Sequence, residues 1–123
     1  MHESAMQPND LEKLFVQRTN AGDLAGLLAL YETNAVLADA TGEVAIGTHR
    51  IREFLVKYLA DHPQLDPSDQ APALCSGDLA LTSTRLRTGD VTAEIARRQP
   101  DGSWLWVIDH LNLSAGQPFR CSS

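Results

Sequence analysis

Cysteine is scarce in this chain, with two residues, Cys75 and Cys121, among 123. The two are not separated by the spacing of a metal-binding or redox motif, and a small secreted domain held together by disulfides would need more of them. We therefore expect two free thiols and no disulfide framework.

Basic residues are outnumbered, because 10 Lys and Arg face 16 Asp and Glu, for a formal net charge of -6 at pH 7. Nucleic-acid affinity comes from clustered Lys and Arg that displace counterions from phosphates, so this balance argues against a nucleic-acid partner. Long apolar runs are also missing, since the stretch 24–31 is far shorter than the roughly 18 residues of a membrane helix. Residues 1–9 lack the cationic and apolar regions of a secretory signal. We expect no membrane span and a cytoplasmic location.

Motifs for metal or cofactor chemistry are absent as well. The four histidines, His2, His49, His62 and His110, are scattered, and no two have the spacing of zinc ligands. No serine or cysteine stands in a nucleophile-elbow pattern, and no glycine-rich loop indicates nucleotide phosphates. We expect no metal and no cofactor.

What the chain does have is a globular composition, 43% hydrophobic and 21% charged, on a length that suits one domain. Its first half predicts three amphipathic helices, with Asp10, Asp23 and Thr48 as their N-caps, and the third ends at His62. The apolar positions at helical spacing are, in turn, Leu11, Leu14 and Phe15; Leu24, Leu27, Leu28 and Tyr31; and Ile51, Phe54, Leu55, Tyr58 and Leu59.

Strands account for the rest of the pattern. Residues 35–39 and 43–46 flank a turn and predict a short hairpin between the second and third helices. After a polar loop at 64–70 the apolar residues recur with a period of two, and short turns divide them into four strands. These strands cover residues 71–76, 79–87, 91–99 and 104–113. Loops this short require antiparallel neighbours.

Helices first and a meander second predict an α+β fold, in which a cone-shaped, curved antiparallel or mixed sheet of about six strands wraps around the three helices. The single domain should cover residues 10–113, with a flexible leader at 1–9 and a C-terminal tail at 114–123. A concave sheet covered by helices favours an apolar pocket for a small hydrophobic molecule.

Two aspartates interrupt apolar strand faces. On the last strand, alternation places Asp109 in an aliphatic row with Val107 and Leu111. A buried carboxyl must be paired, hydrated or neutral, so Asp109 is either a satisfied structural group or a functional one. Asp39 shares a face with Leu37 but precedes a turn, where aspartate is common for local hydrogen bonding. Together, the two carboxyls could have pKa values shifted in opposite directions, so that one is ionised and acts as a general base while the other is protonated and donates a hydrogen bond.

Several segments resemble the successive landmarks of bacterial ketosteroid isomerases, in the same order and at near-equal spacing over residues 10–113. They are Asn20-Ala21-Gly22-Asp23-Leu24, Asn34-Ala35-Val36-Leu37-Ala38-Asp39, Gly47-Thr48 with Ile51-Arg52-Glu53-Phe54, and Ile108-Asp109-His110. The resemblance extends to the nuclear transport factor 2-like superfamily and its SnoaL-like polyketide cyclases. The hairpin from Arg97 to Trp104 is similar to uncharacterised members of that group.

The resemblance implies roles for the matched residues. Asp39 falls at the position of the base that moves a proton next to a carbonyl, and Asp109 at that of the protonated acid of the oxyanion hole. The tyrosine of that oxyanion hole falls on Phe15, which has no hydroxyl to donate. Losing such a donor costs on the order of a hundredfold in rate, which argues against true ketosteroid isomerisation. Either Tyr31 or Tyr58 could supply a replacement hydroxyl.

The remaining assignments follow from strand faces and helix stripes. The expected pocket-lining residues are Phe15, Tyr31, Leu37, Phe54, Tyr58, Val107 and Leu111. Trp104, Trp106 and Ile108 should point to the opposite, outer sheet face, where an exposed apolar patch indicates a homodimer interface, as the resemblance also implies. Glu94 and Arg98 share a strand face and form either an exposed charge pattern or part of the pocket.

The sequence thus supports two hypotheses of different classes. The first is a cofactor-independent isomerase, cyclase or dehydratase of a small hydrophobic carbonyl compound, with Asp39 as base and Asp109 as acid. The second is a non-catalytic ligand-binding or oligomerisation module in which both carboxyls are structural.

Overall fold

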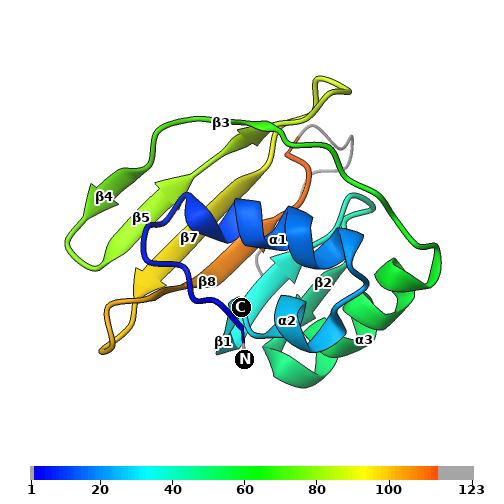
Figure 1. Ribbon diagram of the computed structural model, residues 1–123, viewed down its shortest axis with the longest axis horizontal. Coiled ribbons are helices and arrows are strands. Elements are labelled where there is room, and N and C mark those ends of the chain that lie inside the picture. Colours follow the sequence, from blue (N-terminus) through cyan, green and yellow to red (C-terminus); the bar gives the residue numbers. More distant parts are fainter. Residues whose placement is uncertain (1, 114–123) are drawn as a thin grey trace.

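The computed structural model describes residues 2–113 and contains helices packed on one face of a curved sheet (Figure 1). The helices are α1 (Asp10–Asn20), α2 (Leu24–Leu28) and α3 (Gly47–Ala60). The strands are β1 (Tyr31–Ala38), β2 (Val44–Ile46), β3 (Asp69–Gln70), β4 (Leu74–Ser76), β5 (Leu79–Thr82), β6 (Thr84–Arg85), β7 (Ala93–Arg98) and β8 (Trp104–His110). The predicted α+β class is confirmed.

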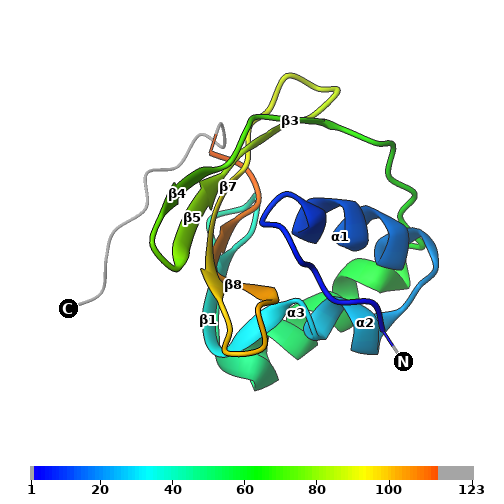
Figure 2. The same ribbon diagram turned by 60° about the vertical axis from the view of Figure 1, so that its left-hand side comes forward.

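Six of the strands form one mixed sheet in the order β2-β1-β8-β7-β5-β4. The neighbours β1 and β8 are parallel, while the other neighbours are antiparallel, as the short loops predict. Strands β3 and β6 form a separate two-stranded ladder. The sheet is curved and does not close, and all three helices lie against its concave side, so no helix of residues 2–113 covers the other side, the outer sheet face (Figures 1 and 2).

A bulge in β8 decides which side chains reach the interior. Ile95 pairs with Ile108, but the next residue of β7, Ala96, pairs with Trp106, so Val107 is an extra residue on β8. A bulge of this kind shifts the alternation of a strand by one position. Trp106 and Asp109, three residues apart, therefore both point to the inner face, with 1% and 2% of their surface exposed.

The predicted outer position of the two tryptophans is wrong for the same reason. Trp104 and Trp106 are buried in the core beneath the helices, because strict alternation without a bulge assigns them to the wrong face. They are therefore not available as interface residues. Ile108, with 46% of its surface exposed, does lie on the outer face as predicted.

The second helix is shorter than its apolar stripe predicts. It ends at Leu28, and Tyr31 begins strand β1 instead of completing a helical stripe. The Asp23 side chain caps this helix by accepting from the Gly26 amide at 2.9 Å, as expected for that residue. The third helix agrees with its prediction within a residue or two at each end.

Residues 2–9 pack on the domain, although we predicted a flexible leader. Ala5 is 2% exposed and belongs to the core, and its carbonyl accepts from the Trp104 amide at 2.8 Å. His2 bonds to the Asp23 carboxylate at 2.7 Å. The predicted tail at 114–123, with Cys121, lies outside the described residues, whereas Cys75 is a free, exposed thiol.

Among the described residues, no helix combines the length and the apolar character that crossing a membrane requires.

Candidate functional site

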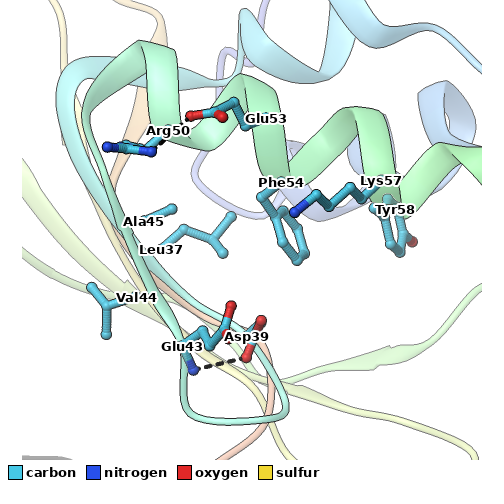
Figure 3. Close-up of a pocket in the computed structure, with 10 residues that line it drawn as sticks. All are labelled: Leu37, Asp39, Glu43, Val44, Ala45, Arg50, Glu53, Phe54, Lys57 and Tyr58. Carbon is cyan, nitrogen blue, oxygen red and sulfur yellow. Dashed lines mark hydrogen bonds and ion pairs between the residues drawn. The ribbon is translucent and has the colours of Figure 1, made fainter.

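Two cavities lie between the helices and the concave face of the sheet, and Tyr58 of α3 lines both of them. The inner cavity, of about 190 Å³, lies beneath α1 and is walled largely by apolar side chains, including Phe15, Trp106 and Leu111. The outer cavity, of about 500 Å³, lies between the β1–β2 hairpin and α3 (Figure 3). Its charged groups include Asp39 and Lys57.

Three carboxyl groups reach the wall of the inner cavity from different elements: Glu12 of α1, Glu94 of β7 and Asp109 of β8. Glu94 and Asp109 are direct partners in the β7–β8 ladder, and each has only 2% of its surface exposed. The Tyr31 hydroxyl donates to Asp109 Oδ2 at 2.6 Å, and the Thr82 hydroxyl donates to Glu94 Oε1 at 2.8 Å. Two of the carboxyls are thus held in place from behind by hydroxyl groups.

Burial raises the pKa values of all three carboxyls. Burial raises the pKa of Asp109 to about 8, the Glu94 charge adds to this rise, and the Tyr31 hydrogen bond opposes it. Burial also raises the pKa of Glu12 to about 8, reinforced by Glu94 and Asp109. The pKa of Glu94 is raised by burial, partly offset by hydrogen bonds from Thr92 and Thr82. A neutral carboxylic acid can donate a hydrogen bond to a ligand oxygen at neutral pH.

Asp39 has a different environment. It follows β1 at the hairpin turn, and its Oδ1 accepts from the Thr41 amide at 2.8 Å and the Thr41 hydroxyl at 2.6 Å. The same atom accepts from the Glu43 amide at 3.0 Å (Figure 3). Burial acts to raise the pKa of Asp39, but these hydrogen bonds outweigh burial and lower it. Asp39 is therefore an ionised carboxylate that organises the turn and lines the outer cavity.

Aromatic rings form the partition between the two cavities. Phe15 lies with its ring centroid 6.0 Å from that of Tyr58 and 5.8 Å from that of Trp106. On the other side, Tyr58 stacks on Phe54 with centroids 5.9 Å apart and an interplanar angle of 14°. Such contacts hold a ring in place, so the position of Tyr58 sets the boundary of each cavity.

The predicted site residues divide between these two spaces. Phe15, Leu111 and Asp109 line the inner cavity, and Leu37, Phe54 and Asp39 line the outer one. Asp39 and Asp109, which we expected around a single pocket, therefore face different cavities. Tyr31 lies behind Asp109 and bonds to it, and Val107 occupies the bulge; neither is among the residues that line the two cavities.

Sequence reasoning missed Glu12 and left Glu94 undecided. Glu94 is buried in the pocket, while Arg98 is exposed and pairs with Asp78 at 2.7 Å, so the two do not act together. Glu12 precedes Phe15 by three positions, a spacing that places both on one helix face. That spacing was the available signal, but a glutamate in the first turn of a helix is also typical of favourable interaction with the helix dipole.

Within residues 2–113, no group of three or more His, Cys, Asp or Glu side chains is arranged to hold a metal ion. The carboxyls of the inner cavity lie against aromatic and aliphatic side chains, an arrangement that suits a hydrophobic molecule with a hydrogen-bond acceptor.

The SnoaL-like domain family model matches residues 13–119 of the chain. No curated protein matches it in sequence. Among solved structures, a proposed association domain of calcium/calmodulin-dependent protein kinase type II from Thiobacillus denitrificans is similar, with a TM-score of 0.78 and 12% identity over 92% of this chain and 100% of that one.

Two further structures are similar in fold. A proposed dehydratase of the nuclear transport factor 2-like family from Streptomyces avermitilis has a TM-score of 0.69 and 16% identity, covering 89% of this chain and 95% of that one. A ketosteroid isomerase-like protein from Erwinia carotovora atroseptica has a TM-score of 0.66 and 18% identity, covering 86% and 93%. At these identities the likeness concerns the fold alone.

Proposed function

The chain belongs to the SnoaL-like domain family of the nuclear transport factor 2-like superfamily, and we propose that it binds a small hydrophobic carbonyl compound in its inner cavity and moves a proton on it. The reaction would be an isomerisation, cyclisation or dehydration that proceeds by carboxyl-mediated proton transfer without a cofactor. The names of the dehydratase and the ketosteroid isomerase-like structure are consistent with this class.

The observation that carries the proposal is the state of Asp109. Its carboxyl lies at an apolar cavity, has a pKa that burial raises to about 8, and accepts a 2.6 Å hydrogen bond from Tyr31. A protonated acid fixed in a low-dielectric site can stabilise the negative charge that develops on a carbonyl oxygen when a neighbouring C–H bond is broken. A purely structural carboxyl would more commonly be ionised and bonded to backbone amides, as Asp39 is.

The volume of the inner cavity limits the ligand. Pockets for drug-sized molecules measure roughly 300 to 1,000 Å³, whereas this cavity measures about 190 Å³. A monocyclic ketone fits such a volume, and a steroid does not. Residue 15, at the position of the oxyanion-hole tyrosine of ketosteroid isomerases, is a phenylalanine, which is also consistent with a substrate other than a ketosteroid.

The experiment is a thermal-shift comparison of cyclohexanone with methylenecyclohexane, which has a similar shape but no oxygen. At about 100 times its dissociation constant, a ligand should stabilise the fold by roughly 2.7 kcal/mol. We expect stabilisation by the ketone, little by the hydrocarbon, and a weakened ketone effect in Asp109→Leu, which keeps the volume but removes the donor. Equal shifts with both compounds, or no shift with either or with larger cyclic ketones, would contradict the proposal.

A second candidate is a non-catalytic oligomerisation module. It is favoured by one comparison, since the structure with the TM-score of 0.78 is named as an association domain. In that case the inner cavity would bind no ketone, and the outer sheet face would carry the function.

A further inference from the structure

Glu12 occupies a position that no other carboxyl of the site shares. It lines the inner cavity together with Asp109, and it also lines a neighbouring hollow of about 230 Å³ beneath residues 67–70. Its carboxyl bonds to the Ser68 side chain across that hollow. Glu12 is partly buried, whereas Glu94 and Asp109 are almost fully buried. It is therefore placed to exchange protons both with a ligand and with the surroundings.

We propose that Glu12 is the general base of the inner cavity, acting from α1 on a ligand whose carbonyl oxygen is held by Asp109 of β8. This inference rests on the proposed function and deepens it, because it assigns to Glu12 the proton transfer that the sequence assigned to Asp39.

The geometry favours Glu12 over Asp39 on two grounds. A base must come within hydrogen-bond reach of the proton that it removes, and Glu12 shares the cavity of Asp109 whereas Asp39 lines the other one. The Asp39 Oδ1 atom is also occupied by three donors of its own turn. Those hydrogen bonds stabilise the ionised form and so weaken it as a base.

Apart from Lys13, which lines the neighbouring hollow beside it, the groups that face Glu12 are acidic or neutral. They are Glu94 of β7, Asp109 of β8, the Tyr58 hydroxyl of α3, the Tyr31 hydroxyl of β1 and the Ser68 hydroxyl of the 64–70 segment. None of the residues that line the inner cavity is a cation. When one carboxyl ionises, its charge makes ionisation of the others harder, so ionised and protonated carboxyls coexist in the cluster near pH 8.

The chemical step balances within these residues. The Glu12 carboxylate takes the proton from the carbon beside the carbonyl, and the C–H electron pair forms the C=C bond of an enol. The carbonyl π pair moves to oxygen, which receives the proton of Asp109. If the proton on Glu12 is first replaced by one from solvent, its return to the same carbon gives exchange. Transfer from Glu12 to a conjugated carbon gives isomerisation, and in both cases Asp109 recovers its own proton from the enol oxygen.

The test is exchange of the C2 hydrogens of cyclohexanone for deuterium in D₂O, followed by NMR and corrected for the rate without protein. This readout needs no knowledge of the natural substrate. We expect Glu12→Gln to lower the exchange rate by roughly a hundredfold or more, the usual contribution of a positioned base. Asp39→Asn should retain most of the rate, and so should Glu3→Gln, a matched exposed glutamate.

The pH dependence separates a base from a residue that only shapes the cavity. The wild-type rate should follow a bell-shaped curve with its maximum near pH 8, where one proton is shared between Glu12 and Asp109. Glu12→Asp should regain part of the activity that Glu12→Gln loses, because it restores a carboxylate. Ketone-induced NMR shifts verify that Glu12→Gln still folds and binds.

The outcomes distinguish this inference from the proposed function. If the wild type exchanges but Glu12→Gln keeps its rate while Asp39→Asn loses it, the assignment of the base to Glu12 is overturned and the proposed function stands. If the wild type binds the ketones yet exchanges none of them, proton transfer at this site is refuted, and the assignment to Glu12 falls with it.

Discussion

The Tyr31 hydroxyl donates a 2.6 Å hydrogen bond to Oδ2 of Asp109, joining the first residue of β1 to a carboxyl 78 positions later in the chain. Both groups are buried, and the parallel pairing of β1 with β8 brings them together. This contact is expected in an enzyme and in a non-catalytic module alike, because it stabilises the fold and also orients an acid at the cavity.

Removing the Tyr31 hydroxyl should affect Asp109 directly. In Tyr31→Phe we expect a loss of about 1 kcal/mol in the free energy of unfolding, the usual value of a buried hydrogen bond. The pKa of Asp109 should rise further, because the Tyr31 bond favours the ionised form. Chemical denaturation and ¹³C NMR of the carboxyl group measure these two effects. Tyr58→Phe is the matched control and should leave the pKa of Asp109 nearly unchanged.

Stability should fall as pH rises from about 5 to 8. Asp109 ionises near 3.8 in the unfolded chain and near 8 in the folded protein, so folding takes up a proton between these values. Each pH unit in this window should cost up to about 1.4 kcal/mol per such group, and Glu12 acts in the same direction. Below about pH 4, carboxyls with lowered pKa values, such as Asp39, lose their stabilising bonds.

Thermal unfolding between pH 4 and 9 tests this expectation. The asparagine of Asp109→Asn is close to aspartate in shape and cannot ionise. The stability of this variant should therefore fall less between pH 5 and 8 and should exceed that of the wild type at pH 8. A wild-type stability that rises steadily from pH 5 to 8 would show that Asp109 is ionised in the folded protein.

The outer sheet face should form a homodimer interface, as the sequence resemblance implied, with Ile108 as predicted but with other residues in place of the two tryptophans. One apolar side chain from each strand forms a row of directly paired neighbours, here called the apolar row. It consists of Leu74, Leu81, Ile95, Ile108, Val36 and Ile46. Four of its members are more than 40% exposed, and exposed apolar patches of this kind are typical of interfaces.

Sedimentation equilibrium on Ile108→Lys tests the apolar row. We expect the wild type to be dimeric at micromolar concentration and the variant to be monomeric, because a charge at the centre of the row would be desolvated by dimerisation. Val56→Lys, at an exposed apolar position on α3, is the control and should remain dimeric. A monomeric wild type at 100 µM would exclude this interface.

Tyr58 should set the size limit of the ligand, since its ring lies between the inner and outer cavities. In Tyr58→Leu the two spaces should join, and ketones with a side chain long enough to enter the outer cavity should bind at least tenfold more tightly than they bind the wild type. Calorimetry on a series of 4-alkylcyclohexanones measures this. Val44→Ala, which alters only the outer cavity, should leave the size limit of the ligand unchanged.

Local sequence signals were sufficient for most elements of the fold. The stripe of α3 and the Asp23 cap depend on neighbours within one or two helical turns, and the hairpin turns depend on a few adjacent residues. The expected single sheet of about six strands was correct for that reason. The end of α2 was not predicted, because Tyr31 fits the helical stripe of Leu24, Leu27 and Leu28 and only pairing with β8 makes it a strand residue.

The sequence by itself determined the α+β class, the positions of the turns and the presence of carboxyls on apolar strand faces, because each depends on local periodicity. Only the tertiary structure decided which carboxyls meet. A one-residue bulge at Val107 turned Trp106 to the same face as Asp109, and the packing of α1 brought Glu12 to that cavity while Asp39 stayed at its turn. A bulge is a change of register between two paired strands, and a shared cavity depends on where the helices pack. Neither can be read from the spacing of residues along one segment.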